Sequence, residues 1–203
     1  MEQNVMKFSL ALFDFDGTLT RKDTFLDFHR FFWGMRRFGA MMATIAGGCL
    51  SRRFDRDFLK ETFLARLWKN VPYETYLEGA RRYAELCVED LLLPLAVEVF
   101  CRHIERGHDV RIVTASMKEW IEPWASRHGV PLLATELEVL DGRLTGRLSG
   151  KNCRGPEKVN RIRKILDLER YDKIYAYGNS GGDLEMLDLA DEKVYKWDHV
   201  PRF

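Results

Sequence analysis

The first apolar segment of the chain reads Phe8-Ser9-Leu10-Ala11-Leu12-Phe13-Asp14-Phe15-Asp16-Gly17-Thr18-Leu19-Thr20. A near-continuous apolar run that ends in a glycine-containing turn predicts a strand buried on both faces, as in a parallel sheet covered by helices. Asp14 and Asp16 then lie at the carboxyl end of this strand, where open α/β sheets bind ligands. Residues two apart in extended backbone point the same way, so both carboxylates are expected to face one pocket. Mg²⁺ and a phosphate ester would suit such a pair of acids.

Composition and charge set the outer bounds of the fold and the function. The 203 residues are 46% hydrophobic, which is enough to bury the core of one α/β domain or of a core with a smaller insertion. Lys and Arg number 32, Asp and Glu number 31, and the net charge of +1 argues against a nucleic-acid surface. The four cysteines have no metal-binding spacing, and residues 1–7 lack the features of a signal peptide. These features predict a cytoplasmic protein with reduced thiols, and they leave its oligomeric state open.

A mainly helical segment is predicted between the first strand and the rest of the core. Residues 22–92 carry apolar side chains at helical spacing, and residues 38–51 within them have no charge and lie between Arg36-Arg37 and Arg52-Arg53. This uncharged segment of 14 residues is too short to cross a bilayer, so no transmembrane span is predicted. The favoured interpretation is a buried helix. The alternative is an apolar surface that holds a lipophilic substrate or enters a membrane interface, which would make the protein membrane-peripheral.

Two later segments add a hydroxyl and a cation. Asp109–Ser116 is predicted to be a short strand that ends in hydroxyl residues, among them Thr114, and the backbone amides at the start of the following helix would add donors. Pro156 suits the first turn of another helix, which places Lys158 at that helix's positively polarised end. A cation is locally unfavourable there unless an anion is bound, so Lys158 is a candidate for binding one.

The last polar segment follows the strand predicted at 173–177. It reads Gly178-Asn179-Ser180-Gly181-Gly182-Asp183 and precedes a helix, so the residues alone predict an ordinary Gly-rich turn capped by Asp183. Between the second and third segments, residues 135–140 and 143–149 are joined by Asp141-Gly142, which predicts a β-hairpin with a tight turn.

Together these four segments resemble the four signatures of the haloacid dehalogenase-like (HAD) phosphohydrolases, specifically the branch similar to phosphoserine phosphatase. The resemblance covers almost the whole chain. It implies a doubly wound, Rossmann-like α/β core with a parallel sheet, formed by residues 1–21 and 93–203, and a helical cap inserted at 22–92. It also implies a Mg²⁺-dependent phosphatase that acts on a small phosphorylated substrate through an aspartyl-phosphate.

The resemblance assigns roles to individual residues. Asp14 would be the nucleophile, and Asp16 would protonate the leaving oxygen and then activate water. The implied sets are, for catalysis, Asp14, Asp16, Thr114 and Lys158; for substrate binding, Thr18, Asp23, Thr114, Ala115 and Lys158; and for the metal, Asp14, Asp16, Asn179 and Asp183. The sequence departs from the family at Asn179, where an aspartate is usual, and the lost charge should weaken metal binding.

Asn179 is also the one feature that favours a different class of function, a phosphate-binding regulatory protein without turnover. The retained Asp16 argues against that class, because a protein that only holds phosphate has no use for a leaving-group acid. A phosphotransferase is a third alternative.

Phosphoserine-specific members use a cap glutamate and a cap arginine, whereas here the acidic position matches Asp23 and no arginine matches clearly. We therefore expect a larger or more lipophilic phosphomonoester to be preferred over phosphoserine.

Overall fold

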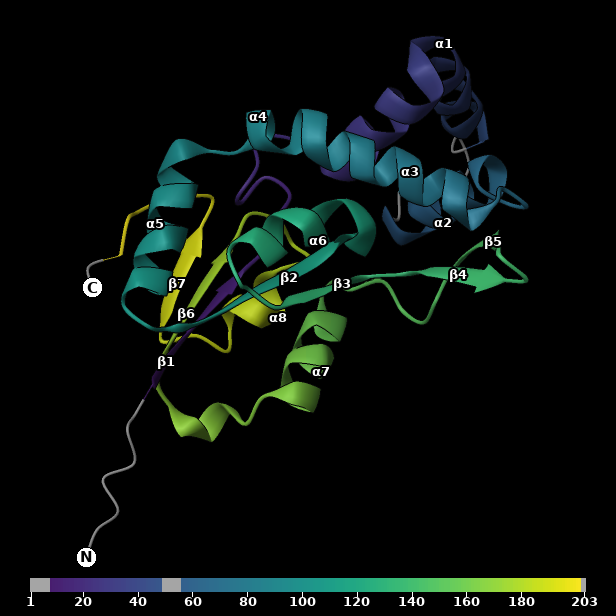
Figure 1. Ribbon diagram of the computed structural model, residues 1–203. Helices are drawn as coiled ribbons and strands as arrows, with labels where there is room; N and C mark the ends of the chain where they lie inside the picture. The colour runs from purple at the N-terminus through teal and green to yellow at the C-terminus, as the bar shows by residue number, and fades with distance from the viewer. Residues whose placement is uncertain (1–7, 49–55, 202–203) are drawn as a thin grey trace, which may run out of the picture.

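Five parallel strands form the central sheet, in the order β3-β2-β1-β6-β7 (Figure 1). The computed structural model describes residues 8–48 and 56–201. The strands of this sheet are β1 (Phe8–Phe13), β2 (Asp109–Met117), β3 (Leu132–Thr135), β6 (Tyr171–Gly178) and β7 (Glu192–Tyr195). The central place of β1 brings its carboxyl end between those of β2 and β6, which are its two neighbours.

Alternate side chains of β1 enter two separate cores, one on each face of the sheet. Ala11 and Phe13 join the core that packs against α5 (Pro94–Glu105) and α6 (Lys118–Arg127). Leu10 and Leu12 join the smaller core beneath α7 (Pro156–Ile165) and α8 (Leu184–Leu187). All four side chains are fully buried, which explains the continuous apolar run from Leu10 to Phe13. The predicted doubly wound α/β core is confirmed.

The segment between β1 and α5 contains helices and no strand among its described residues. Its elements are α1 (Thr24–Gly48), α2 (Arg56–Leu67), α3 (Tyr73–Tyr83), a π-helical turn at Ala84–Val88 and α4 (Glu89–Leu91). The hairpin β4 (Leu137–Leu140) and β5 (Arg143–Leu148) lies against α2 (Figure 1). Gly146 makes this approach close, because a Cβ there would lie 2.9 Å from Cα of Ala65. We refer to these helices as the cap, and its boundaries at 22 and 92 stay a prediction.

Helix α1 differs from the favoured expectation of a buried helix at residues 38–51. It bends at Gly34, whose φ of 73° is left-handed, and beyond the bend it packs on one side only. Ile45 is buried and Phe38 and Met41 are partly buried, but Met42 is 40% exposed. The second half of α1 is therefore only half-buried, because its opposite side has no other element packed against it. Residues 49–51 of the predicted segment lie outside the described part of the chain.

His29 is locked in the aromatic interior of the cap. Its Nδ1 lies 2.6 Å from the carbonyl oxygen of Phe25, and the indole N–H of Trp68 donates to its Nε2 at 2.7 Å. Because Nε2 accepts, the ring is neutral and Nδ1 carries the proton. Burial lowers the pKa of His29 to about 4.

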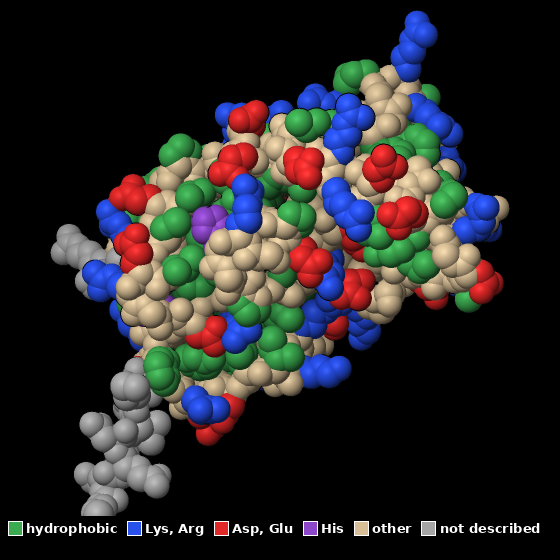
Figure 2. Space-filling view, in the orientation of Figure 1, with side chains coloured by type: hydrophobic (Ala, Val, Ile, Leu, Met, Phe, Trp, Pro, Cys, Tyr) green, Lys and Arg blue, Asp and Glu red, His purple; other side chains and the backbone are tan. Residues whose placement is uncertain are grey.

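Within the described residues, no helix is both long and apolar enough to span a membrane. On the described part of the face in Figure 2, basic and acidic side chains are intermixed, and hydrophobic side chains lie between them.

Candidate active site

Asp14 follows directly after β1, and its N–H donates to the carbonyl oxygen of Tyr177 at 2.9 Å, which continues the pairing with β6. The chain then turns sharply: the N–H groups of residues 18, 19 and 20 all lie within 3.2 Å of the carbonyl oxygen of Phe15. Gly17 has a left-handed φ of 74°, which explains the glycine at this position. The turn directs Thr18 back to the aspartate, where its Oγ1 donates to Oδ2 of Asp14 at 3.1 Å.

Lys158 is the buried centre of an ion triad. It lies in the first turn of α7, and its Nζ is 2.6 Å from Oδ1 of Asp14, 2.6 Å from Oδ1 of Asp183 and 2.6 Å from the carbonyl oxygen of Val113. Burial alone would lower the pKa of Lys158, but the charges of the two aspartates raise it overall. Burial raises the pKa of Asp14 to about 6, against the opposing effect of Lys158. The structure thus joins three residues that are far apart in sequence.

Asp16 is held by two donors from different parts of the chain. Its Oδ1 accepts the backbone N–H of Thr24 at 2.8 Å, and its Oδ2 accepts the hydroxyl of Ser116. Burial, followed by the charges of Asp23 and Asp14, raises the pKa of Asp16 to about 7. A carboxyl group with this pKa can carry a proton near neutral pH and also give it up, as an acid–base group must.

Asp183 organises the loop that follows β6. Its Oδ2 accepts the N–H of Asn179 at 3.2 Å, the N–H of Ser180 at 2.9 Å and the Ser180 hydroxyl at 2.8 Å. Burial would raise its pKa, but the Lys158 charge and these hydrogen bonds hold the pKa of Asp183 below its usual value. Both carboxylate oxygens are therefore engaged by protein donors.

The oxygen groups around Asp14 fit a hard divalent ion such as Mg²⁺. Asn179 lines the pocket, and its amide lies so close to Gly17 that a Cβ on Gly17 would be 1.9 Å from Nδ2. The Asp14 carboxylate, the Asp16 main-chain carbonyl and the Asn179 amide oxygen supply the required ligand type. No group of three or more His, Cys, Asp or Glu side chains that could hold a metal occurs within residues 8–48 and 56–201. A metal ion at this site would therefore also need the Asn179 amide oxygen and the Asp16 main-chain carbonyl as ligands.

The remaining predicted residues are divided between the pocket and its support. Ala115 and Asp23 line the pocket, and Oδ1 of Asp23 accepts the N–H of Leu26 at the start of α1. Thr114 is buried and is not among the residues that line the pocket; its Oγ1 accepts the N–H of Ser116 at 3.0 Å. A direct contact of Thr114 with phosphate therefore stays a prediction.

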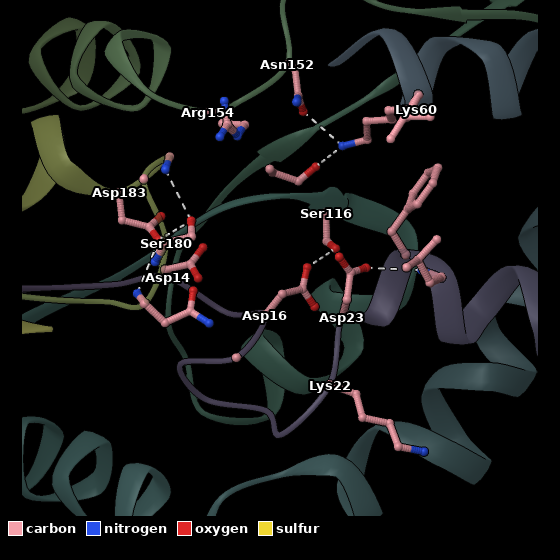
Figure 3. A pocket seen from close by; sticks show the side chains of 18 of the residues that line it. Asp14, Asp16, Lys22, Asp23, Lys60, Ser116, Asn152, Arg154, Ser180 and Asp183 are labelled. Atoms are coloured by element: carbon pink, nitrogen blue, oxygen red, sulfur yellow. Dashed lines mark hydrogen bonds between the residues drawn. The ribbon is translucent and has the colours of Figure 1, made fainter. Parts of the chain in front are cut away.

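Lys60 and Asn152 are two pocket residues that the motifs do not identify. Lys60 reaches from α2 to the carbonyl oxygen of Ala115 and lies 2.9 Å from Oδ1 of Asn152 (Figure 3). The side-chain amide of Asn152 donates to Asp57, which lies on α2 like Lys60, at 2.6 Å. Burial lowers the pKa of Lys60 to about 8. Helical periodicity alone places Lys60 on a helix, and only the packing of the cap shows that it enters the pocket.

These residues surround a cavity of about 800 Å³ between the sheet edge and the cap. Its polar floor contains Asp14, Asp16 and Asp183, and Lys60 and Asn152 lie on the opposite side in Figure 3. The cap contributes an apolar wall formed by Phe25, Leu26, Met42, Ile45, Leu59 and Phe63. The arrangement can therefore combine a phosphoryl group at the floor with an apolar group against the wall.

Comparisons with known proteins agree with this fold. The chain is 39% identical over 192 residues to protein CicA of Caulobacter vibrioides, which covers 92% of this chain and 85% of that protein. A crystal structure of a protein with unknown function from Bordetella pertussis is 27% identical, with a TM-score of 0.76 over 94% of this chain and 90% of that one. A substrate-bound phosphoserine phosphatase structure is similar in fold, with 23% identity and a TM-score of 0.64 over 93% of this chain and 86% of that one.

The sequence profile of the haloacid dehalogenase-like hydrolases matches residues 11–188. This range runs from β1 to α8 and includes Asp14, Asp16, Lys158 and Asp183. The chain belongs to the haloacid dehalogenase-like hydrolase family, as its four motifs predict.

Proposed function

We propose that the protein is a Mg²⁺-dependent phosphomonoester hydrolase that works through an aspartyl-phosphate on Asp14. The observation that carries this proposal is the pairing of two differently held acids. Asp14 contacts the buried cation Lys158, whereas Asp16 is held by the neutral donors Thr24 and Ser116. One carboxylate is thereby kept ionised as a nucleophile, and the other can carry the proton that the leaving group needs.

In the proposed reaction, a carboxylate oxygen of Asp14 attacks phosphorus and the bond to the leaving oxygen breaks. Asp16 gives its proton to that oxygen, so the leaving group departs as an alcohol. Asp16 then accepts a proton from water as the water attacks phosphorus, and the bond between phosphorus and Asp14 breaks to release phosphate. Lys158 stays beside Asp14 and offsets charge throughout.

Asp14, the Asp16 carbonyl and Asn179 would hold the Mg²⁺ ion, with Asp183 holding the loop and Lys158 in place. When bound, the ion would neutralise the charge of the transferring phosphoryl group. The backbone amide of Ala115 would donate to a phosphoryl oxygen.

We further propose that the substrate has an apolar or bulky leaving group. The apolar wall of the cavity supports this proposal, and so do the hydrogen bonds that Lys60 already makes within the protein. A single ammonium bound to two neutral oxygens does not reproduce the bidentate contact of an arginine with an amino-acid carboxylate. Phosphoserine should therefore be a poor substrate.

A panel of phosphomonoesters assayed with Mg²⁺ tests both parts. It should contain phosphoserine, phenyl phosphate and a lipid phosphate presented in detergent, with kcat/KM measured for each. We expect turnover of phenyl or lipid phosphate above phosphoserine, and no turnover by Asp14→Asn. A preference for phosphoserine would contradict the assignment of the leaving group. Absence of hydrolysis throughout would contradict the hydrolase, and transfer to an added alcohol would indicate a phosphotransferase.

A further inference from the structure

Arg154 is a cation of the pocket that has no side-chain partner among the described residues. It lies in the loop between β5 and α7, lines the cavity and is partly buried (Figure 3). In the described ranges 8–48 and 56–201, no residue forms a hydrogen bond, ion pair or ring contact with its guanidinium. The other cations that line the cavity each have a partner. Arg21 donates to the Asp90 carbonyl, Lys22 pairs with Asp27, Lys60 and Lys158 are bound as above, and Lys196 lies near the Tyr195 ring.

The stem of Arg154 is held in place by a glycine. A Cβ on Gly182 would lie 2.7 Å from Cγ and 2.8 Å from Nε of Arg154, so the side chain occupies the space that a larger residue would fill. The two loops are also joined directly, because the N–H of Gly155 donates to the carbonyl oxygen of Gly182 at 2.8 Å. Arg154 is therefore positioned by the fold, although nothing in the described chain binds its charge.

The charge balance of the cavity favours an additional anion. The lining cations are Arg21, Lys22, Lys60, Arg154, Lys158 and Lys196, and the lining acids are Asp14, Asp16, Asp23 and Asp183. A bound Mg²⁺ would increase the excess of positive charge. One phosphoryl group at Asp14 would be bound by Lys158 and the metal ion, which leaves a partly buried guanidinium without a counter-charge.

Arg154 is not part of the ion triad around Lys158. It forms no ion pair with Asp14, Asp16 or Asp183, whereas Lys158 contacts both Asp14 and Asp183 at 2.6 Å. Lys158 therefore holds the position beside the Asp14 carboxylate, which leaves the charge of Arg154 for a different anionic group of the substrate. In Figure 3 the side chain of Arg154 lies between Asn152 and the loop that holds Asp183, where its stem packs against Gly182.

We propose that Arg154 is a specificity residue that binds an oxyanion on the leaving group, either a carboxylate or a phosphodiester. This inference rests on the proposed phosphatase function and narrows its substrate class. The preferred substrate then carries three parts: a phosphomonoester at Asp14, an apolar body against the cap and a second anion at Arg154. A guanidinium can bind either anion through two parallel hydrogen bonds.

The test uses alkyl phosphates of matched chain length, between about two and eight carbons, that end in a methyl group, a carboxylate or a methyl phosphodiester. For each length, the ratio of kcat/KM between the anionic and the methyl ester is measured. Arg154→Gln keeps the stem over Gly182 but removes the charge, and we expect it to lower this ratio about ten- to a hundredfold. Arg163→Gln, on the exposed side of α7, is the matched control and should leave the ratio unchanged.

The outcomes separate this inference from the proposed function. An equal loss on anionic and methyl esters, or no loss on either, would overturn the role of Arg154. The carboxylate and phosphodiester arms show which anion it binds. If the wild-type protein hydrolyses none of the esters, the phosphatase proposal fails. In that case the corresponding alkylphosphonates, titrated calorimetrically against the wild type and Arg154→Gln, still decide the inference from the ratio of Kd values.

Discussion

Nζ of Lys158 lies 2.6 Å from Oδ1 of Asp14, and both side chains are buried. The contact keeps the proposed nucleophile next to a fixed positive charge before any substrate binds. It also makes the nucleophile part of the core, because the same ammonium contacts Asp183 and a backbone carbonyl of β2. A substitution of Asp14 should therefore mainly reduce activity, whereas a substitution of Lys158 should also reduce stability.

Asp14→Asn is expected to abolish turnover while the protein stays folded. The amide cannot act as the nucleophile, but it can still accept a hydrogen bond from Lys158, whose charge remains paired with Asp183. Steady-state rates and circular dichroism would be measured together. Substantial activity in a folded Asp14→Asn variant would contradict the assignment of the nucleophile.

Asp16→Asn is expected to lose about 10²–10⁴ in rate, because it removes the acid and base but retains Asp14. With p-nitrophenyl phosphate, whose leaving group needs little protonation, the phosphoenzyme should accumulate. Mass spectrometry of the quenched protein would detect it. Wild-type rates in this variant would show that Asp16 is not the acid–base group.

Lys158→Met is expected to lower the free energy of unfolding by about 3–5 kcal/mol, because Asp14 and Asp183 would be left buried without their cation. Lys164→Met is the matched control, since Lys164 lies on the same helix with its side chain exposed. Urea denaturation compares the two. Equal stability of the variants would mean that the triad contributes nothing to folding.

Asn179→Asp is expected to tighten Mg²⁺ binding by restoring a carboxylate beside Asp14. Asp183→Asn should act mainly on the loop, since both oxygens of Asp183 already accept hydrogen bonds. Calorimetric titration with Mg²⁺ distinguishes the two positions. An unchanged affinity in Asn179→Asp would exclude this residue as a direct ligand.

His29 should make stability depend on pH. Its pKa is about 4 in the folded protein, below the unperturbed 6.5, so the unfolded chain binds the proton first as pH falls. The contribution is complete above pH 6.5 and is lost as pH decreases toward 4, which amounts to about 2 kcal/mol between pH 7 and pH 5. His29→Gln, measured by urea denaturation at both pH values, should show a smaller pH dependence. An unchanged pH dependence would argue against a neutral buried ring.

The sequence predicted the parts of this structure that depend on local pattern. The apolar run before Asp14, the position of Pro156 and the turn at Asp141-Gly142 each determine an element locally, and the structure has β1, α7 and the β4–β5 hairpin at these places. Strand β3 was not predicted, because its four residues carry no periodicity and form a strand only by pairing with β2.

Contacts between distant segments account for what the sequence did not reveal in the site. Ser116 holds Asp16 across 100 residues, and Lys60 meets Asn152 across 92 residues. Ser116 lies in the second motif segment, but nothing in the sequence indicates that it binds Asp16, and Lys60 lies outside all four segments. At residues 38–51 the sequence left a buried helix and an apolar surface as alternatives, because an uncharged segment does not show how many helices will cover it, and α1 is exposed on one side.

The hydrogen bond from the N–H of Thr24 to Asp16 joins the proposed acid–base group to the first turn of the cap. Thr24 and Ser116 also share a hydroxyl contact at 3.0 Å, so the same three residues connect the turn after β1 with α1 and β2. Any movement that lifts α1 from the sheet must break the bond that orients Asp16. If α1 moves away from the sheet, the proposed proton donor loses this alignment, so a closed contact between α1 and the sheet is the arrangement in which Asp16 is held for catalysis.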